Sequence, residues 1–356
     1  MIDCFHRIRS LSKEGIKIHL HTYEYGRPHS KEIEALCSSV NYYLRDTSAK
    51  RHFSLLPYSV VSRRSDQLLK NLLNDDYPVL FDGIQTTIFL DDPALAERRK
   101  AVRIHNIEPR YYSTLARYEK NPVRKLYYYI EAFKLWRYEK ILKKPECLIT
   151  VSIVDHEYYN RRFHNSFLIP SSHPYDSVSC REGTGDFVLY HGDLSVNENV
   201  AVTEFLISRV FSKIPFQCII SGTKHPENLK AIISKYSNIK LVPDPGTDTM
   251  DNLIRNAHIN VIPTMETNGL KLKLLISLFC GRHCIVNSTT INGSGLYSLC
   301  HIADTEEKMV QKISGLMGKP FTQEMIEERR KILVKNHDNK VNAARLIRLL
   351  FPEVEK

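Results

Sequence analysis

The sequence lacks the features that mark membrane-spanning, disulfide-stapled and metal-binding proteins. No apolar run approaches the roughly 20 residues of a membrane-spanning helix, and no secretory signal peptide is visible. The eight cysteines are scattered without a C-x-x-C pair, so we expect free thiols in a reducing compartment. There is also no Asp-x-Asp motif, and we expect neither a bound metal nor a cofactor.

The positive charge of the chain comes without a nucleic-acid motif. The chain carries 50 Lys and Arg against 40 Asp and Glu, yet no RNP-like, helix-turn-helix or zinc motif accompanies them. Residues 1–170 hold 28 basic and 20 acidic side chains, whereas residues 171–356 hold 22 and 20. The first half therefore favours an anionic partner, and we expect no nucleic acid.

The length and the apolar pattern predict two α/β domains. A chain of 356 residues with 42% hydrophobic and 25% charged content is long for a single globular core. In the second half, strand-like apolar runs alternate with amphipathic, helix-like segments, which predicts a parallel sheet covered on both faces. The strand-like runs are residues 187–192, 216–222, 239–243, 258–263 and 284–287.

The segment after the fourth run is the best candidate for a ligand site. Ligands of parallel α/β sheets bind beyond the carboxyl ends of the strands. The residues that fall at such ends are Gly192, Gly222, Glu266 and Gly269. A helix opens after Gly269, and the first N–H groups of a helix attract anions. Lys271 and Lys273 would add charge for a phosphate, although a plain strand–helix turn with solvated lysines shows the same local pattern.

Three motifs in this half resemble the donor half of GT-B glycosyltransferases. They are Tyr190-His191-Gly192-Asp193-Leu194-Ser195, Ile220-Ser221-Gly222 and Glu266-Thr267-Asn268-Gly269-Leu270-Lys271-Leu272-Lys273. The similarity is greatest to a retaining group that includes many bacterial polysaccharide and lipopolysaccharide enzymes. In the first half, Arg103-Ile104-His105-Asn106-Ile107-Glu108 with Tyr111-Tyr112 resembles the acceptor-side loop of a bacterial branch of that group. The resemblance covers almost the whole chain and implies two Rossmann-like, doubly wound domains facing a cleft.

The resemblance implies a role for each of these segments. The second half would hold the diphosphate of a nucleotide-sugar, and Glu266 would accept hydrogen bonds from the sugar hydroxyls. His105 would touch the sugar from the acceptor side, and the alternative is a partly exposed loop histidine without a site role. The implied sets are His105 and Glu266 as catalytic residues, Gly192, Gly222, Lys224, Asn268, Gly269, Leu270, Lys271 and Lys273 for the donor, and Asp82, Gly83, Asn106 and Glu108 on the acceptor side, with no metal.

The sequence departs from the family where a leaving diphosphate is stabilised. The positions that hold an arginine and a lysine in related enzymes hold Asp193 and Glu198 here, and both have the wrong sign for a diphosphate. The second glutamate of the family, which binds the ribose, is replaced by Ile276 or, in another alignment, by Leu274. Either the lysines of the second loop supply the missing charge, with Lys224 as a further candidate, or donor binding is weakened.

Loop-forming residues between Pro170 and Asp186 predict the domain boundary. We expect an acceptor-side domain over residues 1–175, a donor-binding domain over 183–337, and a helix over 338–356 that crosses back to the first domain, as it does in the family. Residues 2–13 predict a helix and residues 16–22 a strand. Relatives begin earlier, with a strand and a glycine-rich loop, so we expect that the first domain lacks its first strand.

Residues 110–144 predict one or two helices broken near Asn121-Pro122, with basic and aromatic side chains interleaved. Such a segment can lie on an anionic membrane, which suits an acceptor carried on a lipid. The interpretation that we favour instead places the aromatic side chains in the core and leaves the lysines solvated, with Glu131 and Glu139 as their helical partners.

Together these features predict a glycosyltransferase. It would move a sugar from a nucleotide-sugar to a glycan or lipid-linked acceptor in cell-surface polysaccharide synthesis, by a retaining and metal-independent reaction. We expect it in the cytoplasm, with peripheral contact at the inner face of an anionic membrane. The alternative is a catalytically silent GT-B subunit that binds a glycan or a partner enzyme; a nucleotide-sugar epimerase on the same architecture lacks an evident acid–base set.

Overall fold

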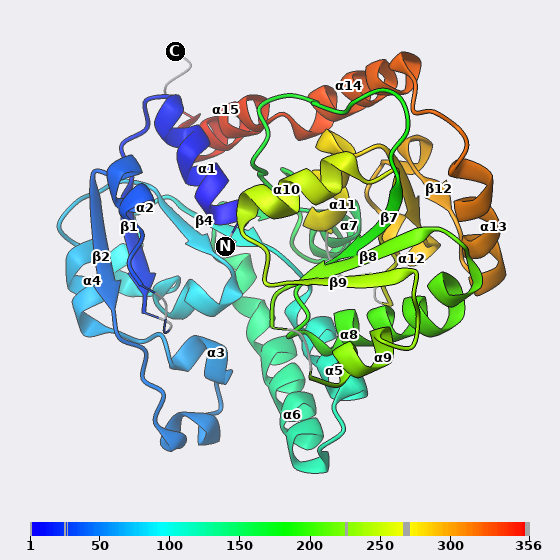
Figure 1. The fold of residues 1–356 in the computed structure, drawn as a ribbon. Coiled ribbons are helices and arrows are strands. Elements are labelled where there is room, and N and C mark those ends of the chain that lie inside the picture. Colours follow the sequence, from blue (N-terminus) through cyan, green and yellow to red (C-terminus); the bar gives the residue numbers. More distant parts are fainter. Residues whose placement is uncertain (1, 25, 27, 225–226, 266–270, 353–356) are drawn as a thin grey trace. The chain divides into compact units, whose positions relative to one another are not determined.

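The computed structural model describes residues 2–24, 26, 28–224, 227–265 and 271–352, and they form two compact α/β units (Figure 1). Among these residues, unit 1 comprises 2–172 and 339–352, and unit 2 comprises 173–265 and 271–338. Each unit is built on parallel strands, so the predicted α/β class is confirmed. The C-terminal helix lies in unit 1 with residues from the start of the chain.

The parallel strands of unit 1 form two separate sheets. The larger has the order β3-β4-β5-β6, with β3 (Val79–Asp82), β4 (Lys100–Ile104), β5 (Cys147–Thr150) and β6 (Ser166–Leu168). The smaller pairs β1 (His19–Tyr23) with β2 (Ser39–Tyr43). In the part of the chain that the structure describes, no ladder joins the two sheets. Side chains meet instead: the His19 ring stacks on Tyr77 with 5.6 Å between ring centroids.

Helices cover both faces of the larger sheet because its side chains alternate. Phe81, Val102 and Leu148 pack in a cluster with Leu135 and Tyr159 from two helices on one face. The residues between them, such as Ala101 and Ile149, pack with the first and last helices of the chain on the other face. The helices of unit 1 are α1 (Ile2–Lys13), α2 (Lys31–Leu36), η1 (Ala49–Phe53), α3 (Tyr58–Val61), α4 (Asp66–Leu72), η2 (Ile84–Phe89), η3 (Pro93–Leu95), α5 (Glu108–Tyr118), α6 (Pro122–Tyr138), η4 (Glu139–Lys143), α7 (Ile153–Phe163) and α15 (Asn339–Leu350).

Unit 2 contains one parallel sheet of order β12-β11-β10-β7-β8-β9 in its described residues. Its strands are β7 (Phe187–His191), β8 (Gln217–Gly222), β9 (Ile239–Pro243), β10 (Ile259–Val261), β11 (His283–Val286) and β12 (His301–Ile302). All five predicted strand runs correspond to strands here, and β12 is an addition at the edge. Its helices are α8 (Asn197–Phe205), η5 (Leu206–Val210), η6 (Phe211–Lys213), α9 (Glu227–Ile233), α10 (Thr247–Asn256), α11 (Leu272–Cys280), α12 (Ser288–Ile291), η7 (Tyr297–Leu299), α13 (Glu306–Leu316) and α14 (Gln323–His337).

The faces of this sheet are divided in the same way. Val188 and Tyr190 of β7 pack with α8, η5, α9 and α13, whereas Leu189 between them packs with α10 and α11. A strand that is apolar on both faces must be covered twice, which is why β7 reads as a continuous apolar run in the sequence.

The break between α5 and α6 lies where the sequence predicts it. Asn121 caps α6, because its side-chain oxygen accepts hydrogen bonds from the N–H groups of Val123 and Arg124 at 3.0 and 3.1 Å. Pro122 occupies the first position of the helix, where the lack of an N–H has no cost.

Three aromatic side chains of α6 correct the interpretation that the aromatic residues belong to the core, whereas Tyr138 packs against the core as expected. Phe133 is 56% exposed and Trp136 is 53% exposed, and Tyr129 is exposed as well. The core face of α6 is instead formed by Glu131, Ala132 and Leu135. Hydrophobicity alone misleads here because the buried carboxylate of Glu131 is hydrogen-bonded: it accepts from the N–H of Tyr58 at 2.7 Å and pairs with Lys134 at 2.8 Å.

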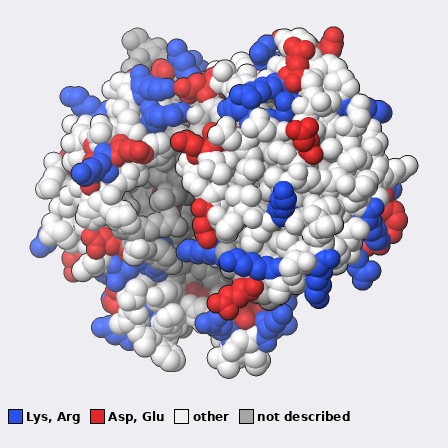
Figure 2. Space-filling view, in the orientation of Figure 1, with Lys and Arg blue, Asp and Glu red and all other residues white. Residues whose placement is uncertain are grey.

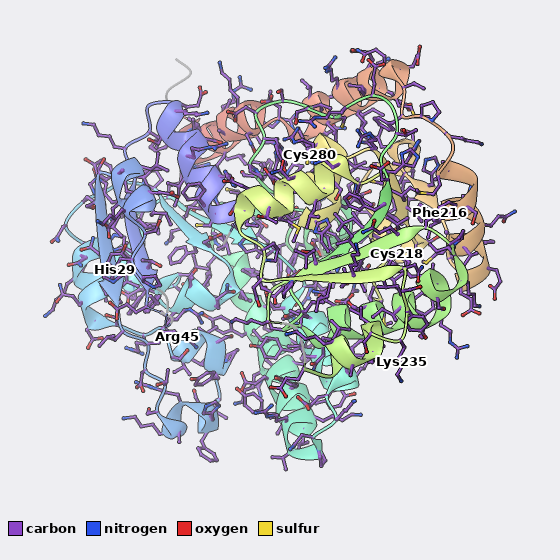
Figure 3. The ribbon with its side chains drawn as sticks, viewed as in Figure 1. His29, Arg45, Phe216, Cys218, Lys235 and Cys280 are labelled. Atoms are coloured by element: carbon purple, nitrogen blue, oxygen red, sulfur yellow. The ribbon has the colours of Figure 1, made fainter. Side chains whose placement is uncertain are left out.

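All eight cysteines are free thiols. Cys218 on β8 and Cys280 at the end of α11 are buried in unit 2 (Figure 3). Burial raises the pKa of each of these thiols to about 12, so both stay protonated. Among the described residues, no helix combines the length and the apolar character needed to cross a bilayer.

Candidate functional site

The strand order of unit 2 reverses between β7 and β10, and the candidate site lies at this reversal. β8 and β9 follow on one side of β7, and β10, β11 and β12 continue on the other. The helix after β7, α8, covers one face of the sheet, and the helix after β10, α11, covers the opposite face. Loops that diverge in this way open a crevice at the carboxyl edge, which is where open α/β sheets bind ligands.

Side-chain hydrogen bonds hold the loop after β7 in its conformation and connect it to the loop after β8. Asp193 Oδ1 accepts from the Ser195 N–H at 3.0 Å, from the Ser195 hydroxyl at 2.7 Å and from the Thr223 hydroxyl at 3.4 Å. The Asn199 amide donates to the Asp193 carbonyl at 2.8 Å. Burial alone would raise the pKa of Asp193, but these hydrogen bonds outweigh it and hold that pKa below its ordinary value. Asp193 is thus an exposed carboxylate that fixes the conformation of this loop.

Gly222 lets the loop after β8 lie directly against the loop after β7. A Cβ at Gly222 would lie only 2.0 Å from the Gly192 carbonyl oxygen, so any side chain would force the loops apart. Gly192 itself has room for a side chain, since the nearest atom to its Cβ position is 3.5 Å away. Lys224 is exposed close by in a left-handed conformation, with φ of 54°, and its N–H donates to Asp244 Oδ1 at 2.8 Å. The structure therefore places Gly192, Gly222 and Lys224 at one edge of the sheet.

The chain that leaves β10 is anchored as far as Met265. The Asn287 amide donates to the Thr264 carbonyl at 2.7 Å, and its oxygen accepts from the Thr264 N–H at 3.2 Å. Glu198, in the first turn of α8, accepts from the Met265 N–H at 3.1 Å. The carboxylate that sequence analysis treated as an unfavourable charge thus ties the two diverging loops together.

Lys273 lies in the first turn of α11 and reaches back across the reversal. Its Nζ lies 5.1 Å from the centroid of the Tyr190 ring and donates to Asn199 Oδ1 at 3.3 Å. Burial lowers the pKa of Lys273 to about 8; Glu198 opposes this effect and Lys271 adds to it. An ammonium that has lost part of its hydration gains more from a phosphate than a solvated one, so Lys273 is suited to bind an anion.

Four of the predicted site residues, Glu266, Asn268, Gly269 and Leu270, lie outside the described residues. Lys271 is the N-cap residue of α11, and an ammonium has no acceptor with which to cap the first-turn N–H groups. Leu274 is fully buried and Ile276 packs on the cluster around Leu189. Both positions serve the core, so the ribose contact of the family's second glutamate has no counterpart at either.

In unit 1, the predicted acceptor-side residues gather at the carboxyl ends of β3 and β4. Asp82, the last residue of β3, lies opposite Arg103 of β4, and His105 follows β4 directly. Gly83 turns the chain with φ of 100°, and a Cβ there would lie 2.4 Å from the Gln85 side chain. His105 Nε2 donates to Asp82 Oδ1 at 2.8 Å.

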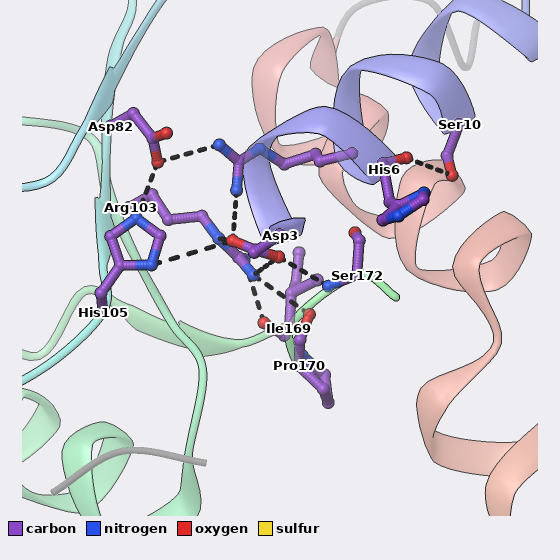
Figure 4. A network of polar contacts seen from close by, with 10 residues as sticks. Asp3, His6, Ser10, Asp82, Arg103, His105, Ile169, Pro170 and Ser172 are labelled. Carbon is purple, nitrogen blue, oxygen red and sulfur yellow. Dashed lines mark hydrogen bonds and ion pairs between the residues drawn. The ribbon is translucent and has the colours of Figure 1, made fainter. Parts of the chain in front are cut away.

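His105 belongs to a network of charged groups that reaches α1 (Figure 4). Arg103 donates to both carboxylate oxygens of Asp3 at 3.1 Å, and Arg7 donates to Asp3 at 2.7 Å and to Asp82 at 2.8 Å. His105 Nδ1 lies 3.8 Å from Asp3 Oδ2. Both ring nitrogens of His105 therefore face carboxylates of unit 1, which orient the imidazole.

The arginines dominate the electrostatics of this network. Burial would raise the pKa of Asp82, but Arg7 and the hydrogen bond from His105 outweigh it and hold that pKa well below its ordinary range. Burial would also raise the pKa of Asp3, but the charges of Arg103 and Arg7 outweigh burial, so the pKa of Asp3 is lowered. Both aspartates therefore remain ionised at neutral pH.

Glu108, which begins α5, has a pKa near neutrality. Burial raises the pKa of Glu108 to about 7, while His105, a hydrogen bond from Asn106 and the charge of Arg63 act in the opposite direction. At neutral pH the side chain is divided between acid and carboxylate, a property of groups that accept and donate protons.

Sequence analysis missed Asp3 and Arg7. They are four residues apart on α1, a spacing that usually denotes a solvated ion pair, and both side chains are buried here. It also gave no role to His191, which ends β7 with Nε2 3.2 Å from the Ser277 hydroxyl oxygen. Burial lowers the pKa of His191 to about 3 and Lys273 adds to the effect, so this imidazole is neutral.

Comparison with known proteins places this architecture among the GT-B glycosyltransferase folds. Anabaena HepE, whose structure was determined in complex with UDP and glucose, superposes with a TM-score of 0.64 over 92% of this chain and 98% of that chain, at 8% identity. TarM superposes with a TM-score of 0.59 and 14% identity, covering 80% of this chain but 57% of that one. The chain therefore has the GT-B fold, as the motifs predict.

Comparisons of sequence alone do not identify a family for this chain. No protein-family model matches the chain. An uncharacterised 44.6 kDa protein in the cps region of Klebsiella pneumoniae is 25% identical over 315 residues, which span 83% of this chain and 79% of that protein.

Proposed function

We propose that the chain is a glycosyltransferase that moves a sugar from a nucleotide-sugar donor to a glycan or lipid-linked acceptor in cell-surface polysaccharide synthesis. The observation that carries the proposal is the reversal of strand order between β7 and β10, with Lys273 and the start of α11 beside it. The complex of HepE with UDP and glucose and the cps-region relative support it.

The proposed reaction requires charge stabilisation more than acid–base chemistry. When the bond between sugar and diphosphate breaks, negative charge grows on the diphosphate. Lys271 and Lys273 would stabilise that charge together with the N-terminal end of α11, where the helix dipole is positive. They would take the place of the arginine and lysine that Asp193 and Glu198 replace, and we propose that no metal takes part.

On the other side of the sugar, we propose that His105 and its neighbours bind the acceptor end. Asp82 orients the His105 ring, Asn106 follows on the same loop, and Glu108 begins α5. Glu266 would accept hydrogen bonds from the sugar hydroxyls. In a retaining displacement on one face of the sugar, the acceptor proton passes to the departing diphosphate, so these residues would position the groups without removing the proton.

A catalytically silent GT-B subunit is the second candidate. The features that favour it are the acidic side chain of Asp193 beside Gly192 and an apolar residue, Ile276 or in the other alignment Leu274, where the family has its ribose-binding glutamate. Such a subunit would keep the fold and bind a glycan or a partner enzyme.

Thermal-shift measurements against UDP, GDP and their sugar conjugates test the proposal without a known acceptor. Ligand binding to the folded state raises the melting temperature in proportion to RT ln(1 + [L]/Kd). We expect one nucleotide and its sugar conjugate to raise the melting temperature. We also expect that conjugate to release free nucleotide slowly in the presence of the protein. A shift without nucleotide release, even with candidate acceptors, would favour the silent subunit. No shift with any nucleotide would contradict donor binding.

A further inference from the structure

The exposed face of α6 is an apolar stripe along the length of the helix. The side chains are Val123, Leu126, Tyr129, Ile130, Phe133 and Trp136, and all of them are exposed. Their spacing of three and four residues places them on one side of the helix. The opposite side, with Glu131, Ala132 and Leu135, is buried in unit 1. The helix is therefore apolar on the side that faces away from its own unit.

A second exposed apolar segment continues the stripe. Phe53 at the end of η1 is 88% exposed, and Leu55 just after it is 93% exposed. This segment is fixed to α6 by polar contacts: Lys134 Nζ donates to the His52 carbonyl at 3.0 Å, and the His52 ring lies 3.2 Å from the Tyr127 hydroxyl. We call the exposed apolar residues 53, 55, 56, 123, 126, 129, 130, 133 and 136 the α6–η1 face.

The exposed charges along α6 itself are positive, and just beyond the helix the exposed carboxylate of Asp91 pairs with Lys144 at 2.9 Å. Arg124, Lys125, Arg137 and Lys140 of the α6 region are exposed. Between Asn121 and Lys144 the sequence has two carboxylates, Glu131 and Glu139, and both are fully buried and paired, with Lys134 and Arg162. Figure 2 shows uncharged surface at the free end of α6, with Lys and Arg on both sides of it and a group of Asp and Glu above it.

We propose that the α6–η1 face docks unit 1 on the surface of an anionic lipid bilayer. Tryptophan, tyrosine and phenylalanine side chains enter the interfacial layer of a bilayer, and lysine and arginine beside them pair with anionic headgroups. A second copy of this chain is a poorer occupant, because a two-fold interface would bring the same exposed positive charges together.

The biological purpose of this docking rests on the proposed function. An acceptor carried on a lipid stays at the membrane, so an enzyme docked there meets it in two dimensions. The face itself is defined by exposure and charge and does not depend on the nature of the reaction.

Trp136 makes the test direct, because it is the single tryptophan of the chain and lies on the face. We expect its emission to shift to shorter wavelength, and its quenching by acrylamide to fall, when vesicles of phosphatidylcholine mixed with phosphatidylglycerol are added. Brominated lipids should quench it. Vesicles of phosphatidylcholine alone should bind at least about tenfold more weakly, because the cationic rim lacks a partner there.

Vesicle co-sedimentation of two variants separates docking from general effects. Leu126→Glu combined with Phe133→Glu should lower partition onto the anionic vesicles by about tenfold or more. The matched control is Tyr297→Glu, at an exposed aromatic residue of unit 2, which should bind like the wild type. Both variants should keep the thermal shift with nucleotide, so a failure of donor binding is seen separately. Unchanged Trp136 emission on anionic vesicles, equal sedimentation of the double variant, or self-association through this face would overturn the proposal.

Discussion

The charged side chains at the strand ends of unit 1 and unit 2 are arranged differently. At the carboxyl ends of β3 and β4 in unit 1, two aspartates, two arginines and a histidine satisfy one another. At the reversal between β7 and β10 in unit 2, glycines bring the loops together and Lys273 holds a partly desolvated charge. The first arrangement orders the groups around it, and the second keeps a positive charge, with Glu198 nearby, at the start of α11. Under the proposed function, the charged part of the donor binds to unit 2, and the network of unit 1 does not contribute to the binding of that charge.

Removing the centre of the unit 1 network should have the largest effect. Arg103→Met leaves the buried carboxylate of Asp3 with one arginine fewer, and breaking a buried ion pair costs about 3–5 kcal/mol. Urea denaturation followed by Trp136 fluorescence, which reports unit 1, measures the free energy of unfolding. The control is Arg161→Met, which removes the exposed pair with Glu157 and should change stability by less than about 0.5 kcal/mol. Equal effects of the two variants would show that the network adds no stability.

The stability of unit 1 should depend on pH through Glu108. Its pKa of about 7 in the folded protein lies above the ordinary value near 4.5, so the folded state binds the extra proton between these values. The stability of unit 1 should therefore fall as pH rises from about 4.5 to 7, by on the order of 2–3 kcal/mol. Glu108→Gln should remove this contribution, and Glu157→Gln at an exposed site should not. Parallel stability–pH curves for wild type and Glu108→Gln would contradict the raised pKa.

The smallest effect concerns the acidic loop of unit 2. Asp193→Asn keeps an oxygen that accepts from Ser195 but removes a negative charge beside the proposed diphosphate. We expect UDP or GDP to bind about two- to threefold more tightly, the size of an exposed charge interaction. Asp66→Asn, at an exposed position of unit 1, is the control. Weaker nucleotide binding by Asp193→Asn would show that this carboxylate itself takes part in the site.

The elements that the sequence predicted well are those with a strong period. α1 has the predicted bounds, and α15 lies within the predicted residues 338–356. The alternation in the second half predicted five of the six described strands of unit 2, because a strand covered on both faces is apolar throughout. The same patterns could not predict which side chains pair across the tertiary structure. Asp3 and Arg7 look like a surface pair until β4 brings Arg103 beside them, and Phe133 and Trp136 look like core residues until Glu131 is seen to occupy that face.

For the candidate site, the sequence placed residues at strand ends and could not say what each one contacts. Asp82 and His105 fall at neighbouring strand ends as predicted, but their direct hydrogen bond follows from the register of β3 and β4. Glu198 was interpreted by charge alone, and its bond to the Met265 N–H depends on a loop 67 residues away.

Nucleotide titration of two variants tests the division of roles most directly. We would measure the Kd of the nucleotide that raises the melting temperature, for wild type, for the double variant Lys271→Ala/Lys273→Ala, and for His105→Ala. Charge-assisted contacts are worth about 1.5–3 kcal/mol each, so the lysine variant should bind at least about tenfold more weakly. His105→Ala should bind within about twofold of wild type and lose turnover instead. An unchanged Kd in the lysine variant, or an equal loss of affinity in His105→Ala, would contradict the assignment of the charged part of the ligand to unit 2.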